Sequence, residues 1–277
     1  MSMLSRARTQ ATAVPVAVPL RLRSAAVLTV ASVAGLMMFL WPLLVDVRAE
    51  ENAVQPPFIF LLLLPVVIGV CLAEFTEGGM DSKVLAMLGV LTAINAVMRG
   101  LSAGVAGIEL VFFLLILGGR VFGAGFGFVL GCTSLFASAL LTAGVGPWLP
   151  FQMLASAWVG MMAGLLPRRV TGRWEIVMLV VYGVIAAYAF GLVMNMSSWP
   201  FALGIEVPGH TGSLSFDPGA PMMENLHRFG VYTLLSSTGS WDTGRAITNT
   251  VALVVLGPAV LTTLRRAVRR AVIVPAS

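Results

Sequence analysis

Polar and aromatic side chains gather near the ends of several apolar segments, where they could hold a solute. Asn95 and Arg99 lie in the last turn of one such segment, and Glu109 lies near the start of the next. Amides and ions are costly within a membrane, so they usually face a cavity or one another. Tryptophans would supply flat apolar walls. The residues expected to bind a substrate are Asn95, Arg99, Glu109, Trp148, Gln152, Asn195, Trp199, Trp241, Asp242 and Arg245.

Two simpler explanations of these residues stay open. Trp148, Trp199 and Trp241 could be interface anchors, because tryptophan is enriched where helices leave the bilayer. Arg99 and Glu109 could form a structural ion pair. Neither explanation accounts for the amides of Asn95 and Asn195, so a pocket is the preferred hypothesis.

Catalytic and metal-binding motifs are absent from the sequence. There is no Gly-x-x-x-x-Gly-Lys-Ser/Thr loop, no His-Glu-x-x-His and no Gly-x-Ser-x-Gly elbow. His210 and His227 are read as solvated loop residues. Cys71 and Cys132 lie inside apolar segments without metal-type spacing and are read as small apolar fillers. We therefore predict no catalytic residues, no bound metal and no intrinsic cofactor.

The composition is that of a polytopic membrane protein. Hydrophobic residues make up 58% of the chain and charged residues 10%, with a mean hydropathy of +0.95. A soluble globule would not carry such long apolar runs. The fold class expected is an all-α bundle of about eight membrane-spanning helices. The candidate spans are roughly 25–45, 57–73, 84–99, 103–119, 122–144, 150–166, 175–197 and 246–264.

Basic residues orient these spans. If the N-terminus is cytoplasmic, only four of the 17 basic residues fall outside, namely Arg48, Arg99, Arg228 and Arg245. This asymmetry follows the positive-inside rule and places both termini in the cytoplasm of a cell-membrane protein. The net charge of +5 is thus a product of topology, and no nucleic-acid partner is expected.

The chain divides into a tail, a hairpin and a core. Residues 1–24 form a cytoplasmic tail, and 25–80 form a transmembrane hairpin with a linker. The core covers 82–266 and includes a long outer loop at 198–245, in which a semi-apolar piece at 229–237 is expected to lie on the bundle as a lid. A second cytoplasmic tail follows at 267–277.

Small residues recur at spacings of four. Gly160 and Gly164 form one such pair, and several glycines crowd the segment from 118 to 131. Such spacing lets helices approach closely, so most of these glycines are expected to pack inside the bundle. A strip of them left facing lipid would be a docking surface for another membrane protein.

Four segments together resemble a known family, the substrate-capturing S components of energy-coupling factor (ECF) vitamin importers. They are KVLAMLGVLTAINAVMR (83–99), GIELVFF (107–113), GGRVFGAGFGF (118–128) and GPWLPFQM (146–153). The resemblance covers residues 82–266 as a six-helix S-component-like domain. It is greatest to the branch associated with cobalamin.

The resemblance implies a transport mechanism and a set of partners. S components bind a vitamin at their outer face and carry no ATPase of their own. They dock onto a membrane coupling subunit, the T component, which two cytoplasmic ATPases drive, and they topple in the bilayer to release the vitamin. The resemblance implies docking through a small-residue strip of the first core helix, here Gly89, Thr92, Ala93 and Ala96, where glycine and threonine replace alanines of the family pattern.

Three alternatives stay open beside cobalamin or a related corrinoid as the transported ligand. The vitamin could be thiamine, riboflavin or biotin. The chain could be a membrane enzyme acting on lipid-linked substrates, with Glu109, Asp242 or His227 as acid or base. It could also be a purely structural membrane subunit, in which case alanine at Asn95, Arg99 or Asn195 would change only stability.

Overall fold

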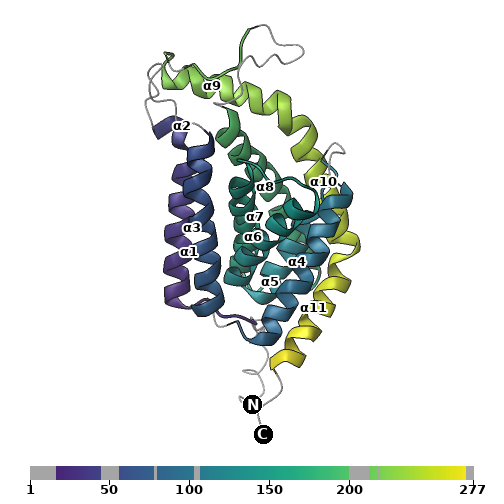
Figure 1. The fold of residues 1–277 in the computed structure, drawn as a ribbon. Helices are drawn as coiled ribbons and strands as arrows, with labels where there is room; N and C mark the ends of the chain where they lie inside the picture. The colour runs from purple at the N-terminus through teal and green to yellow at the C-terminus, as the bar shows by residue number, and fades with distance from the viewer. Residues whose placement is uncertain are drawn as a thin grey trace, which may run out of the picture.

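A computed structural model describes residues 17–44, 56–77, 80–102, 107–199, 212–217 and 219–272. Within these ranges the regular secondary structure is helical, which confirms the predicted all-α bundle (Figure 1). Most of the N-terminal tail, Arg48 and the stretch 200–211, which includes His210, lie outside the described residues.

The N-terminal hairpin is a separate pair of helices at one side of the bundle. It consists of α1 (Leu22–Phe39), the short α2 (Trp41–Leu44) and α3 (Pro56–Glu77), and α1 and α3 lie side by side in Figure 1. The hairpin packs on the core, since α3 contacts α6 and α7. Trp158 of α7 donates a hydrogen bond to Ser32 of α1.

The core begins with five helices: α4 (Ser82–Ser102), α5 (Val111–Phe122), α6 (Ala124–Leu141), α7 (Leu149–Leu165) and α8 (Arg173–Ser198). Glycine lets α5, α6 and α7 meet at backbone distance. A Cβ at Gly119 or Gly127 would overlap the carbonyl oxygen of Gly160. Gly123, with φ of 116°, turns the chain between α5 and α6. The glycines between 118 and 131 therefore pack the core, as the sequence predicts.

The C-terminal part differs from the predicted long loop followed by one straight span. Helix α9 (Met222–Thr233) runs without a break into a π-helical segment, η3 (Leu234–Asp242), and then into α10 (Thr243–Val255). Helix α11 (Gly257–Val272) follows at a bend of 65°. Pro258 explains the bend, because proline has no N–H to continue the helix and its ring clashes with the preceding turn.

A helix lies at each expected span, but among the described residues fewer than the eight predicted are long and apolar enough to cross a membrane. The helices α1, α4, α6 and α8 are long and apolar enough to cross a membrane, and the bent α9–α11 unit adds a fifth. The other three are shorter apolar helices at Leu63–Phe75 in α3, α5 and α7. The start of α1 and the end of α11 lie at one end of the bundle, and α9 lies across the other (Figure 1). We call these the basic end and the α9 end.

Candidate functional site

A cavity of about 330 Å³ opens in the core toward the α9 end. It lies between the last turn of α4, the segment before α5, the α6–α7 connection, the start of α7 and the junction of η3 with α10. Polar and apolar surface line it in similar amounts. The residues around it are Arg99, Gly107, Ile108, Glu109, Thr142, Gly144, Trp148, Gln152, Trp241 and Arg245.

Two arginines meet one carboxylate at this cavity. The Arg245 Nε lies 2.8 Å from Oε2 of Glu109, and the Arg99 Nε lies 3.8 Å from Oε1 of the same residue. Arg245 also reaches Oδ1 of Asp242 at 3.0 Å, and its guanidinium lies over the ring of Phe190 at 4.8 Å. Residues from α4, the α5 approach and α10 are thus fixed against one another by charge.

Arg99 joins the ion cluster to α6 and α7. Its guanidinium donates hydrogen bonds to Oε1 of Gln152 at 3.0 Å and to Oγ of Ser138 at 3.1 Å. Arg99 and Glu109 are about one-fifth exposed, at 21% and 23%. Of the polar side chains predicted to converge, Arg99, Glu109, Gln152 and Arg245 meet at this cavity, and together they can both donate and accept hydrogen bonds.

Two predicted site residues stand behind the cavity rather than in its wall. Asp242 is buried and accepts a hydrogen bond from Ser237 at 2.8 Å, and Ser237 accepts one from Asn195 at 2.7 Å. These hydrogen bonds fix the position of the Asp242 carboxylate, which pairs with Arg245. Gly191 makes room for it, because a Cβ there would overlap the Asp242 carboxylate. Asn195 and Asp242 therefore position Arg245 from α8 and η3.

The three tryptophans separate into two groups. Trp148 and Trp241 line the cavity and are about half-exposed, as cavity walls or interface anchors would be. Trp199 lies elsewhere, fully buried against Phe216 and Phe229, with its Nε1 donating to the carbonyl of Leu214. Trp199 thus fastens α9 to the end of α8.

Asn95 is fully buried on α4 and does not line the cavity. It lies one helical turn below Arg99. Among the described residues, neither atom of its amide has a hydrogen-bond partner.

Sequence reasoning missed several cavity residues that carry no charge. Gly107 has φ of 78°, and a Cβ there would meet the carbonyl of Trp241, so only glycine lets this segment pass η3. Thr142, which lines the cavity, and Ser138, which accepts a hydrogen bond from Arg99, look like ordinary helix residues in the sequence. Gly107, a glycine inside the predicted span 103–119, is the one signal that could have marked the wall, because an isolated glycine weakens a helix prediction.

A second arginine cluster closes the basic end. Arg120 of α5 donates to Oε1 of Glu175 on α8 at 2.7 Å, and both side chains are at most 2% exposed. Arg265 of α11 reaches the same oxygen at 2.6 Å. Arg120 also donates to the carbonyls of Leu166, Pro167 and Val170, which fixes the α7–α8 connection.

Arg168 completes this cluster by donating to the carbonyls of Arg120 and Gly164. Burial lowers the pKa of the Arg168 guanidinium from its ordinary value, and the nearby charge of Arg120 lowers it further. This cluster does not line the 330 Å³ cavity at the α9 end.

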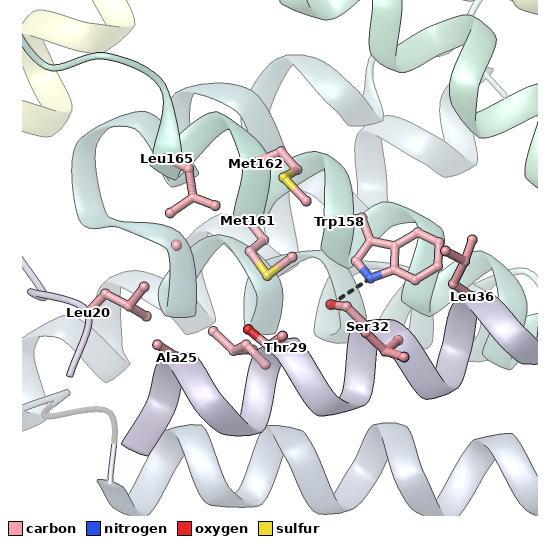
Figure 2. A pocket seen from close by; sticks show the side chains of 12 residues that line it. Leu20, Ala25, Thr29, Ser32, Leu36, Trp158, Met161, Met162 and Leu165 are labelled. Atoms are coloured by element: carbon pink, nitrogen blue, oxygen red, sulfur yellow. Dashed lines mark hydrogen bonds between the residues drawn. The ribbon is translucent and has the colours of Figure 1, made fainter. Parts of the chain in front are cut away.

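A second cavity, of about 420 Å³, lies between α1 and α7 (Figure 2). Its lining is almost entirely apolar, with Met161, Met162 and Leu165 on one side and Leu36 on the other. The hydrogen bond between Trp158 and Ser32 crosses it. A water-soluble ligand would find almost no hydrogen-bond partners here, so this cavity is not the candidate site.

The proposed docking strip is split by the rotation of α4. Gly89 and Ala93 lie on the exposed face, and a Cβ at Gly89 would have open space around it. Thr92 faces α6, where its hydroxyl lies 2.8 Å from that of Thr133, and Ala96 is buried. Of these four residues, Gly89 and Ala93 are exposed, Thr92 is partly buried and Ala96 is buried.

The fold and site define an integral membrane protein with a solute-sized polar cavity. A family model described as "ECF transporter, substrate-specific component" matches residues 83–276. The chain belongs to this family and is a transporter subunit. No curated protein and no solved structure matches the chain significantly. The matched region begins with α4 and leaves the hairpin outside it.

Proposed function

We propose that this chain captures a small water-soluble vitamin in the cavity at the α9 end and delivers it for import. One observation carries the proposal. In a member of the substrate-specific family, Arg99, Glu109 and Arg245 converge on a cavity between Trp148 and Trp241. Indole walls suit a flat heterocyclic ring, and the polar groups at the edge suit its heteroatoms.

The size of the cavity favours a vitamin smaller than a corrinoid. Pockets for small organic ligands span roughly 300–1,000 Å³, and the described residues enclose about 330 Å³. A corrinoid is several times larger than thiamine or biotin and would need a wider opening. Cobalamin stays a prediction from the resemblance, and the volume supports thiamine, riboflavin or biotin.

The proposed orientation places the cavity on the extracytoplasmic side. Among the described basic residues, only Arg99, Arg228 and Arg245 lie toward the α9 end. The others lie at the basic end, which the positive-inside rule assigns to the cytoplasm. Under this orientation the vitamin enters from outside, and Glu175 and Arg265 face the interior.

We further propose that Gly89 and Ala93 contact a membrane coupling subunit that two cytoplasmic ATPases energise. A leucine at Gly89 has room in the isolated chain but would obstruct a close helix–helix contact. Gly89→Leu should therefore leave vitamin binding intact and stop uptake by cells that contain the whole transporter. Gly69→Leu, at an equally open position on α3, is the matched control. Uptake by Gly89→Leu equal to that by the control would refute this docking face.

The capture function is tested by a ligand panel on the purified protein. Thiamine, riboflavin, biotin and cyanocobalamin are each added singly, and the unfolding temperature and calorimetric heat are measured. One of them should raise the unfolding temperature and bind at micromolar concentration or below. Trp148→Ala should weaken that binding, whereas Trp174→Ala, an exposed tryptophan at the basic end, should not. If none of the four binds, the proposal fails for these vitamins.

A further inference from the structure

A second layer of polar groups lies one helical turn deeper than the cavity, on the same three helices that surround Arg99. Side chains four residues apart share a face of a helix. Arg99, Ser138 and Gln152 are joined by hydrogen bonds, and each has a polar residue four positions away on its own helix, toward the middle of the bundle. The pairs are Asn95 with Arg99 on α4, Ser134 with Ser138 on α6, and Ser156 with Gln152 on α7. We call Asn95, Ser134 and Ser156 the deep tier.

Contacts above and below place the deep tier at one level. Arg99 bonds to both α6 and α7 above it. Below it, α4 and α6 are joined by the Thr92–Thr133 hydroxyl contact. Helices α6 and α7 meet at backbone distance where Gly131 faces Ala157. The three helices keep their register across this turn, which places their polar residues at about the same depth in the bundle.

The deep tier is buried, and its hydrogen-bonding capacity is unused. Asn95 and Ser134 are 0% exposed and Ser156 is 1% exposed. Within the described residues, the amide of Asn95 and the hydroxyls of Ser134 and Ser156 have no hydrogen-bond partner. An unsatisfied buried polar group destabilises the folded state, and such groups in native proteins call for a specific explanation. The three groups each lie one helical turn from the contact that Arg99 makes with Ser138 and Gln152, and packing alone does not explain them.

We infer that the deep tier is the inner end of the substrate site and binds hydrogen-bonding heteroatoms of the substrate ring. This inference rests on the proposed function of the cavity. The tier offers an amide, which donates and accepts, and two hydroxyls, which do either. That set matches an amide-like or aminopyrimidine-like ring edge and lacks the formal charge that would pair with a carboxylate. The substrate class is a neutral heterocycle end that carries both donors and acceptors.

Arg99 separates the cavity from the deep tier. Its bonds to Gln152 and Ser138 span α4, α6 and α7 across the route inward. A substrate that reaches the deep tier must displace the Arg99 guanidinium from at least one of them. Arg99 then keeps its ion pair with Glu109, which lines the cavity.

Ser134→Ala and Ser156→Ala distinguish a substrate site from a structural role. Each removes an unpartnered hydroxyl, so the ligand-free protein should unfold at the same or a higher temperature. The affinity for whichever of thiamine, riboflavin, biotin or cyanocobalamin binds the wild type should fall about three- to tenfold per serine. Ser197→Ala is the matched control, because that buried serine on α8 bonds to the Met194 carbonyl. Unchanged affinity in both deep-tier variants would overturn the inference.

A second measurement decides the inference even if none of the four vitamins binds. Ser134→Cys and Ser156→Cys are made in a chain with Cys71→Ala and Cys132→Ala, and a small positively charged thiosulfonate is applied. A site that opens past Arg99 should react at both positions, and Arg99→Ala should speed the reaction. If no vitamin binds and neither cysteine reacts with Arg99 present or removed, the deep tier is sealed core and the inference is wrong.

Discussion

The two ends of the bundle use the same chemical groups for different purposes. At the basic end, Arg120 and Glu175 are at most 2% exposed, and three carbonyl groups accept further hydrogen bonds from Arg120. At the α9 end, Arg99 and Glu109 are about one-fifth exposed and border a cavity. A closed cluster fixes helices in place, whereas an open one leaves polar edges facing a solute-sized space. The comparison shows that surroundings, more than residue type, separate a structural ion pair from a binding site.

The largest expected effect tests the structural side of this comparison. Arg120→Met leaves Glu175 with Arg265 alone and frees three loop carbonyls. Removing one partner of a buried ion pair costs about 3–5 kcal/mol. We expect a large drop in the unfolding temperature measured in detergent. Protein that remains folded should bind its vitamin with unchanged affinity.

A milder variant covers the case in which Arg120→Met does not fold. Arg265→Met removes the more exposed of the two cations that contact Glu175 and leaves the ion pair between Arg120 and Glu175 intact. It should lower stability less and again leave affinity unchanged. A loss of vitamin affinity at constant stability in either variant would contradict the division between the two ends.

At the α9 end we expect the opposite pattern, a small loss of stability together with a clear loss of vitamin affinity. Glu109→Gln removes the charge that Arg99 and Arg245 share, while Asp242 still holds Arg245. The site is partly solvated, so stability should fall by less than about 1 kcal/mol. Calorimetry should show vitamin affinity reduced about tenfold, which corresponds to about 1.4 kcal/mol.

Glu224→Gln is the control for Glu109→Gln, because it also removes a carboxylate from an arginine pair, but on α9 and outside the cavity. Its affinity should equal that of the wild type. Equal losses in the two variants would show a general electrostatic effect and remove the special role of Glu109.

The smallest expected effect probes the support behind the cavity. Gly191→Ala adds a methyl group against the Asp242 carboxylate, which must shift and pull on Arg245. We expect a loss of affinity of a few fold, read from the calorimetric dissociation constant. Gly230→Ala, where an added Cβ has open space, should have no effect. If the two variants bind equally, Asp242 does not position Arg245 for binding.

The sequence predicted the helical bundle and much of the cavity for clear physical reasons. Long apolar runs require helices in lipid, and polar groups at their ends have few options besides facing one another. Arg99, Glu109, Gln152 and Arg245 meet as that argument expects.

The sequence did not predict which face of each helix turns toward which neighbouring helix. Trp199 satisfied the same reasoning as Trp148 but turns into a separate aromatic cluster with Phe216 and Phe229. Thr92 and Ala96 lie on the inner side of α4, away from the face that carries Gly89. A tilt or rotation of one helix by a fraction of a turn decides such outcomes.

The helical character of the segment leading into α10 was also missed. Residues 236–244 read SSTGSWDTG, a composition that is typical of a loop. In the structure this stretch is π-helical and continuous with α10. Its serine and threonine hydroxyls bond to carbonyls four or five residues earlier in the chain, as Ser236 does to Tyr232 and Thr243 to Thr238. Tertiary packing against α8 overrides the local propensity.

The central claim is that the cavity at the α9 end takes up a vitamin from the extracytoplasmic side. Labelling of Trp148→Cys, in the chain with Cys71→Ala and Cys132→Ala, tests it in sealed vesicles of known orientation. A membrane-impermeant thiol reagent should react in right-side-out vesicles and not in inverted ones, and the vitamin that binds the purified wild type should block the reaction. Reaction only in inverted vesicles, or labelling that a saturating concentration of that vitamin leaves unchanged, would contradict the account.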